Sequence, residues 1–235
     1  MVKSIADLSK RQAVTLLRLL YPIWTAVGMF SLMYVPGALI VAGNASATAG
    51  NILANEQLFR WGIVASLCSQ LIHIAVVYIL YKLFETVNKN NALLLVILGL
   101  VGVPIAMLNT LNQVAALLVL RGADFLQGFT TAQLPALAML FLDLNAEGVM
   151  IASIFWGLWL IPLGFLAYRS GYFPKTIGVL LLIAGVGYMS DAFIHFISPG
   201  IQAATLPITT VMTMGEVLFI LWLVIRGAEL PKDEA

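Results

Sequence analysis

Six long runs of apolar residues restrict the possible folds of this chain more than any other feature. They cover residues 18–43, 59–83, 92–120, 148–168, 176–198 and 206–226. Each run reaches the roughly 20 residues with which an α-helix crosses the hydrocarbon core of a bilayer. The runs are continuous rather than alternating in polarity, which excludes a membrane β-barrel. The sequence therefore predicts an all-α polytopic bundle of six transmembrane helices.

The composition agrees with a membrane protein and removes several function classes. Hydrophobic residues make up 61% of the chain and charged residues 10%, whereas soluble domains carry about 25% charged residues. A net charge of +1 gives no reason to expect a nucleic-acid partner. The single cysteine, Cys68, excludes an intrachain disulfide and a cysteine metal cluster. The partner that the composition does predict is the lipid bilayer.

The predicted organisation has an N-terminal arm at 1–16, a six-helix domain at 17–227 and a tail at 228–235. Two connections, 44–58 and 121–147, are long enough to hold structure of their own. Within the second, residues 134–144 are apolar but too short to span the bilayer, and they contain Pro135. We therefore expect a short interfacial helix in this loop, separate from the span that follows.

Basic residues are distributed unevenly over the predicted loops. The arm, the tail and the turns after spans two and four hold Lys3, Lys10, Arg11, Arg18, Lys82, Lys89, Arg169, Lys175, Arg226 and Lys232. The opposite side holds Arg60 and Arg121. Because Lys and Arg accumulate in cytoplasmic loops, we predict a multi-pass protein of the inner (plasma) membrane with both termini in the cytoplasm.

The turn between spans four and five has a distinctive sequence. It reads Tyr168-Arg-Ser-Gly-Tyr-Phe-Pro-Lys175, with Phe155-Trp-Gly-Leu-Trp-Leu-Ile-Pro-Leu-Gly164 before it. Together with Val77-Tyr-Ile-Leu-Tyr-Lys-Leu-Phe-Glu-Thr-Val-Asn-Lys89, this element resembles the bacterial and archaeal multi-pass membrane proteins catalogued as domain of unknown function 4386. The resemblance runs from about residue 21 to residue 226. It implies an integral membrane protein without an established activity, cofactor or set of catalytic residues.

The same turn has a physical interpretation. Gly171 is placed to end one helix and Pro174 to start the next, which predicts a rigid hairpin. Within the following span, Gly178 and Gly185 are seven residues apart. Small residues at such spacing allow neighbouring membrane helices to approach closely.

Ionisable and amide side chains interrupt four of the six spans. Span three carries Asn109, Asn112 and Gln113 on one face, and span five carries Asp191 and His195 one helical turn apart. Counting along the helices places all five in the outer half of the membrane. His73 in span two and Glu216 in span six lie near the middle, at depths that allow them to pair. Because buried polar groups in a membrane are expensive, these seven residues are the candidate ligand-binding set.

Three functions fit this pattern. The first is binding or passage of a small polar or amphiphilic ligand at an outward-facing pocket built by spans three and five. The second is an intramembrane hydrolase or metal-dependent enzyme using Ser69 with His73 or Asp191 with His195. The third is a structural subunit in which the polar side chains form hydrogen bonds between helices. Because the two histidines lie at different depths, we predict no metal site, and no motif specifies a cofactor or an oligomeric state.

Overall fold

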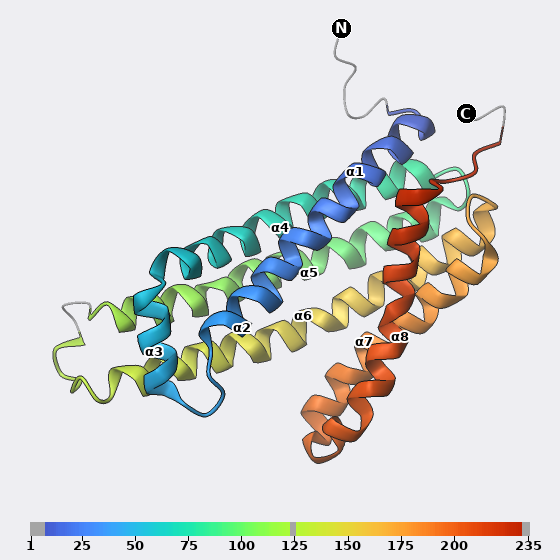
Figure 1. Cartoon of the computed structure of the whole chain (residues 1–235). Helices are drawn as coiled ribbons and strands as arrows, with labels where there is room; N and C mark the ends of the chain where they lie inside the picture. Colours follow the sequence, from blue (N-terminus) through green and yellow to red (C-terminus); the bar gives the residue numbers. More distant parts are fainter. Residues whose placement is uncertain (1–7, 123–125, 232–235) are drawn as a thin grey trace, which may run out of the picture. The chain divides into compact units, whose positions relative to one another are not determined.

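The computed structural model describes residues 8–122 and 126–231, and in these ranges six helices are long and apolar enough to cross a membrane. Figure 1 shows them in chain order, coloured from blue to red. The helical elements are α1 (Lys10–Met29), the π-helical turn η2 (Phe30–Tyr34), α2 (Val35–Leu39), α3 (Ala45–Ala54), α4 (Glu56–Phe84), α5 (Lys89–Leu120), α6 (Leu134–Ser170), α7 (Lys175–Ile197) and α8 (Pro199–Ile225). The predicted all-α fold with six apolar spans is confirmed.

The first span begins inside the segment that the sequence assigned to the N-terminal arm. The Ser9 hydroxyl accepts a hydrogen bond from the Gln12 backbone nitrogen at 3.3 Å, and the Gln12 side chain accepts one from the Ser9 nitrogen at 3.0 Å. This reciprocal pair is a capping box, which starts α1 at Lys10. Residues 10–16 of the predicted arm therefore belong to α1, and residues 1–7 lie outside the described residues.

A π-helical turn separates α1 from α2. The Val35 backbone N–H donates to the carbonyl oxygen of Phe30, one residue further back than in an α-helix. Pro36 follows in the first turn of α2. Because proline has no N–H and its ring crowds the carbonyl four residues earlier, Pro36 disfavours a regular α-helix across this segment. The wider π-helical turn before Pro36 leaves room for the proline ring.

The prediction of a separate helix at residues 134–144 differs from the structure. These residues form the first turns of α6, which continues without a break from Leu134 to Ser170. Pro135 is the second residue of the helix, where a missing N–H costs nothing. The other long connection, 44–58, for which the sequence predicts a helical patch near residues 52–58, contains the short helix α3 at Ala45–Ala54. The Asn44 side chain caps this helix by accepting from the Ala47 nitrogen at 2.9 Å.

The described chain packs as two compact units. Unit 1 comprises Met1–Ile23, Ile72–Val103 and Met150–Ala235, as far as they are described, and unit 2 comprises Trp24–Leu71 and Pro104–Val149. Unit 1 contains the described basic residues of the predicted cytoplasmic loops: Lys10, Arg11, Arg18, Lys82, Lys89, Arg169, Lys175 and Arg226. Unit 2 contains Arg60 and Arg121. Lys3 and Lys232 lie outside the described residues.

Glycines set the close packing of α6 against α7 in unit 1. A Cβ atom added to Gly157 would lie 2.6 Å from the carbonyl oxygen of Gly185, and one added to Gly164 would lie 2.7 Å from that of Gly178. The predicted close approach at Gly178 and Gly185 is confirmed. The turn between these helices is also as predicted, with Gly171 at φ +72° and Pro174 directly before α7. The two helices therefore form a tight antiparallel hairpin.

The last two spans are joined by a single residue. α7 ends at Ile197 and α8 begins at Pro199, so that Ser198 alone connects them. Figure 1 shows the two helices side by side as a second antiparallel hairpin. At the other end of α8, Arg18 of α1 donates to the carbonyl oxygen of Val224 at 3.1 and 2.8 Å. Unit 1 thus contains α8 packed beside α7 and tied to α1.

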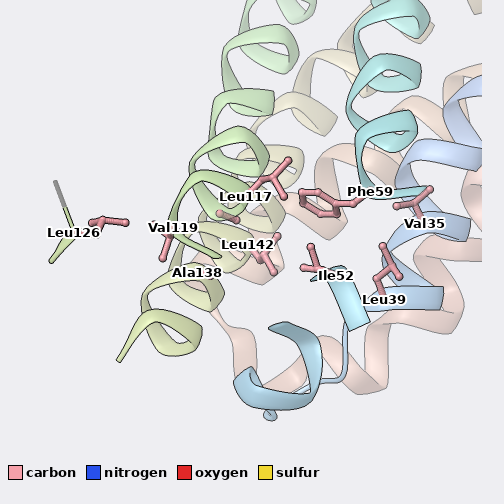
Figure 2. Packing of buried hydrophobic residues seen from close by; sticks show 10 residues of the cluster. Val35, Leu39, Ile52, Phe59, Leu117, Val119, Leu126, Ala138 and Leu142 are labelled. Carbon is pink, nitrogen blue, oxygen red and sulfur yellow. The ribbon is translucent and has the colours of Figure 1, made fainter. Parts of the chain in front are cut away.

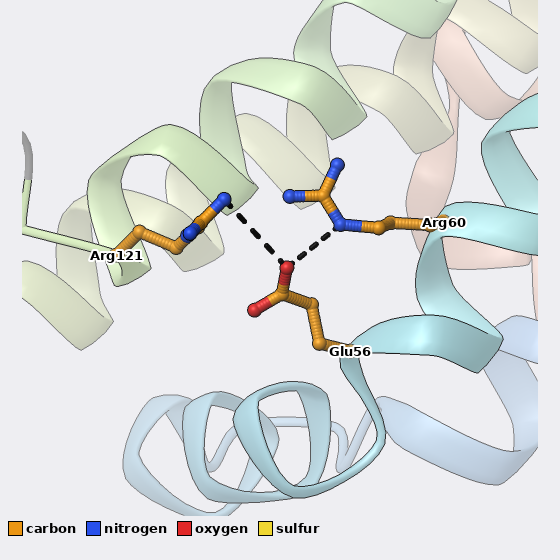
Figure 3. A network of polar contacts seen from close by, with 3 residues as sticks. All are labelled: Glu56, Arg60 and Arg121. Carbon is orange, nitrogen blue, oxygen red and sulfur yellow. Dashed lines mark hydrogen bonds and ion pairs between the residues drawn. The ribbon is translucent and has the colours of Figure 1, made fainter.

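Unit 2 has its own apolar core. Figure 2 shows its buried side chains converging from α2, α3, α4, α5 and α6, with Phe59 among them. Next to this core, Glu56 at the start of α4 pairs with two arginines (Figure 3). Its Oε1 lies 2.7 Å from Arg60 Nε and 3.8 Å from Arg121 Nη1. The ion pairs connect the beginning of α4 to the end of α5.

Candidate functional site

The three amides predicted on span three form a hydrogen-bonded cluster in unit 2, which we call the amide cluster: Asn109, Asn112, Gln113 and Asn145. Asn109 and Asn145 bond reciprocally, since each side-chain nitrogen donates to the other residue's backbone carbonyl, at 2.8 and 3.1 Å. Gln113 Nε2 donates to Asn145 Oδ1 at 3.1 Å, and Asn112 Nδ2 donates to Asn109 Oδ1 at 3.0 Å. The cluster joins α5 to α6.

The backbone of α6 is shaped to receive this cluster. A Cβ atom added to Gly148 would lie 2.0 Å from Asn109 Oδ1 and 2.3 Å from its Cγ. Glycine is therefore required at this position if Asn109 is to reach α6. A further polar contact, between the hydroxyls of Ser66 and Thr110 at 3.2 Å, joins α4 to α5 in the same unit.

A small pocket adjoins the amide cluster within unit 2. It is lined by Ser31, Val35, Pro36, Leu39, Ile40, Phe59, Gly62, Gln113, Leu142 and Asn145. The amides of Gln113 and Asn145 and the hydroxyl of Ser31 are the side-chain polar groups of this lining. The space open to water-sized groups is about 20 Å³, and one water needs about 10–15 Å³. The pocket as described therefore accommodates about one water-sized group.

Asp191 and His195, the predicted residues on span five, lie in unit 1 and contact α8. Thr209 Oγ1 donates to Asp191 Oδ1 at 3.3 Å, and His195 Nδ1 lies 3.0 Å from Gln202 Oε1. Both contacts connect the two arms of the α7–α8 hairpin. The described contacts of Asp191 and His195 thus fit polar links between helices. A pocket shared by spans three and five stays a prediction.

Glu216 lies in unit 1 between two tyrosines. Tyr21 of α1 donates to Oε1 at 3.1 Å, and Tyr188 of α7 donates to Oε2 at 3.2 Å. Neither tyrosine belongs to the seven candidate residues predicted from the sequence. Tyr188 lies three residues before Asp191 on the same face of α7, but its residue type alone does not indicate a contact with Glu216.

His73 is also in unit 1, and its pairing with Glu216 stays a prediction. Its side chain is buried, with the ring edge-on to that of Trp159 at a centroid distance of 5.1 Å. Ser69, the hydroxyl of the hydrolase hypothesis, is buried in unit 2. Among the described residues no group of three or more His, Cys, Asp and Glu side chains is placed to hold a metal ion.

Asn145 is the residue of the amide cluster that the sequence analysis missed. The sequence places it in a loop, at the end of a predicted interfacial segment, and a loop asparagine needs no partner inside the protein. Once α6 is continuous, Asn145 lies three residues before Gly148 on the same face. The apolar segment 134–144 leads into the span at 148–168 without a Gly or Pro turn between them, which was the sequence feature that indicated one longer helix.

The helices and their buried polar contacts define a multi-pass integral membrane protein. Residues 19–227 match the family model described as "Domain of unknown function (DUF4386)", and the chain belongs to this family. An uncharacterised protein from the archaeon Archaeoglobus fulgidus is 42% identical over 82 residues, which is 35% of this chain and 48% of that protein. The match thus spans about half the length of this relative. No solved structure matches the chain.

Proposed function

We propose that this protein binds the polar end of a small uncharged amphiphile at the pocket of unit 2. The observation that carries the proposal is the pairing of two amides, Gln113 and Asn145, with an otherwise largely apolar lining. Ligand sites commonly combine apolar walls with a few polar groups that fix the orientation of the ligand. The pocket has this composition.

The chemistry of the lining favours an uncharged ligand. Gln113 and Asn145 bond to each other within the amide cluster, but each amide keeps a second N–H and a second lone pair on its oxygen. A hydroxyl or amide group on the ligand can therefore be bonded in either direction. No charged side chain lines the pocket. An ionised ligand would lose its hydration without gaining an opposite charge, which is costly in a membrane protein. A neutral hydroxyl is the best match.

The size of the pocket sets a further condition on binding. The space of about 20 Å³ admits a hydroxyl but not a larger headgroup. Ser31, Val35 and Pro36 of the lining belong to the π-helical turn and the start of α2. π-helical turns inside helices are often found at functional sites. We infer that this segment moves when a headgroup larger than a hydroxyl enters.

The expected depth of the site also supports an amphiphile. Asn145 lies three residues before the apolar run at 148–168 begins. This places it at the predicted outer boundary of the hydrocarbon region, where the headgroup of an amphiphile lies. The acyl chain of the ligand then stays in the lipid.

The experiment is native mass spectrometry of the purified protein titrated with monoacylglycerol, with the fatty acid and the alkylamine of equal chain length for comparison. Monoacylglycerol should bind, and Gln113→Leu or Asn145→Leu should weaken its binding by about tenfold, since a lost hydrogen bond costs about 1–1.5 kcal/mol.

Asn112→Leu is the matched control, because Asn112 belongs to the amide cluster but does not line the pocket. It should bind monoacylglycerol like the unmodified protein. Equal binding of the fatty acid, or equal binding by the Gln113 and Asn145 variants, would contradict the proposal.

We also infer that the protein lies in the plasma membrane with both termini in the cytoplasm. The support is the gathering of the described cytoplasmic-loop Lys and Arg residues in unit 1, against Arg60 and Arg121 in unit 2.

A further inference from the structure

A second polar site, in unit 1, is independent of the pocket described above. We propose that Glu216, with Tyr21 and Tyr188, forms a proton-binding site inside the membrane that takes up and releases one proton.

The geometry isolates one carboxyl group between three helices. Tyr21 from α1 and Tyr188 from α7 contact different oxygens of Glu216 on α8, at 3.1 and 3.2 Å. The Tyr21 side chain is fully buried, and its ring packs edge-on against Phe219 at 5.7 Å. The Tyr21 hydroxyl is thereby held in place at the carboxyl group.

The charge of this group needs compensation. In the described part of the chain no Lys, Arg or His side chain forms an ion pair with Glu216. Arg18, one turn before Tyr21, donates to the Val224 carbonyl instead. An ionised carboxylate without a countercharge is costly in a membrane span. A bound proton removes that charge.

The two tyrosines allow the site to hold both protonation states. When the carboxyl group is ionised, both phenol hydroxyls donate to it. When it is protonated, its O–H donates to one phenol oxygen, because a phenol is both donor and acceptor. The reaction is the dissociation of one proton from the carboxylic acid, with no other bond made or broken. The heavy atoms need not move.

Among the described residues, the titratable groups that hydrogen-bond to Glu216 are Tyr21 on α1 and Tyr188 on α7. Other ionisable side chains contact α8 away from Glu216: Asp191 at Thr209, His195 at Gln202 and Arg18 at Val224. On α8 itself, Glu216 is the one ionisable side chain in Pro199–Ile225. Proton exchange at Glu216 is therefore governed mainly by the two phenols.

A probe that dissolves in the lipid can test the site. Glu216 is half-buried, so part of its residue surface is accessible. A hydrophobic carbodiimide, dicyclohexylcarbodiimide, partitions into bilayers and reacts with protonated carboxyl groups. The acid adds across one C=N bond, and the adduct rearranges to a stable N-acylurea without a leaving group. The labelled peptide gains the mass of one reagent molecule.

The test treats the full-length protein in liposomes with this reagent over a range of pH and locates the label by peptide mass spectrometry. Glu216 should be labelled, and the labelling should decline as the pH rises. It should be the same in a buffer with Na⁺ as in one with choline as the cation. Glu216→Gln should lose this label. Gln113→Leu, in the pocket of unit 2, should be labelled like the unmodified protein, which separates this proposal from the preceding one.

Tyr21→Phe and Tyr188→Phe test the role of the phenols. Each should shift the pH at which labelling is half-complete, and unchanged profiles in both would contradict the arrangement proposed. Protection by Na⁺ would instead indicate a metal-cation site. Infrared difference spectra between acidic and alkaline pH provide a readout that needs no reagent: a carboxylic-acid band should be present and should disappear in Glu216→Gln. Absence of both label and band would overturn the proposal.

Discussion

The side chain of Asn109 fills the space that a side chain at position 148 would need. A Cβ atom on Gly148 would lie 2.0 Å from Asn109 Oδ1. The reciprocal bonds between Asn109 and Asn145 thus depend on the glycine one turn further along α6. The missing side chain at Gly148 on α6 and the amide of Asn109 on α5 therefore pack as a complementary pair.

Gly148→Ala should destabilise the protein by about 1–3 kcal/mol, because the added methyl group displaces Asn109. Thermal unfolding in detergent measures the effect. When Gly148→Ala is combined with Asn109→Ala, the space for the methyl group is free again. The double variant should therefore lose less unfolding free energy than the sum of the losses in the two single variants. Simple additivity would show that the two positions do not interact.

Glycines between α6 and α7 should be equally sensitive. Gly164→Ala places a Cβ atom 2.7 Å from the carbonyl oxygen of Gly178, and a backbone atom cannot rotate away. We expect a loss of roughly 1–3 kcal/mol. The control is Gly50→Ala in α3, where a Cβ atom meets nothing within 4 Å. It should be neutral or stabilising by about 0.5–1 kcal/mol, since alanine favours a helix. Similar losses at both positions would refute the packing explanation.

The ion pairs of Glu56 should contribute little to the free energy of unfolding. Arg60 and Arg121 both approach Glu56 Oε1, but Arg121 is at 3.8 Å and largely exposed. Arg121→Gln should change the unfolding free energy by at most about 0.5 kcal/mol and Arg60→Gln by at most about 1 kcal/mol. Both effects should shrink when melting is measured in high salt. A loss that salt leaves unchanged would point to packing of the arginine stem instead.

Single-cysteine labelling tests the orientation. In a Cys68→Ala background, a membrane-impermeant maleimide should modify Ser46→Cys on intact cells and Asn90→Cys only after permeabilisation. Both side chains are exposed. Ser170 is a less suitable position for the inner side, because its hydroxyl accepts from the Tyr172 nitrogen in the turn. Reversed accessibility would place the termini outside.

The sequence predicted what hydrophobicity and turn chemistry decide. The six spans, the turn at Gly171 and Pro174, and the close packing at Gly178 and Gly185 all follow from local residue types. The partners of Asp191 and Glu216 do not, because they depend on the rotation of each helix about its axis. Thr209 and the two tyrosines are unremarkable in the sequence, and helix rotation alone brings them to the carboxylates.

The interruption of α6 was predicted wrongly for a different reason. Residues 134–144 are too short to span the bilayer and contain a proline, which led to the prediction of a separate helix, although Pro135 falls in the first turn of α6. Asn145 then obtains its hydrogen bonds from α5 rather than from water. A tertiary contact satisfies the polar residue and removes the reason for the helix to end.

The one-residue connection at Ser198 has a practical consequence for anyone who modifies this protein. Proteases and inserted tags need several residues of accessible, extended chain, and the link between Ile197 and Pro199 provides none. An epitope or fusion partner placed there would have to unwind the ends of both helices. The α7–α8 hairpin should therefore survive limited proteolysis as one fragment.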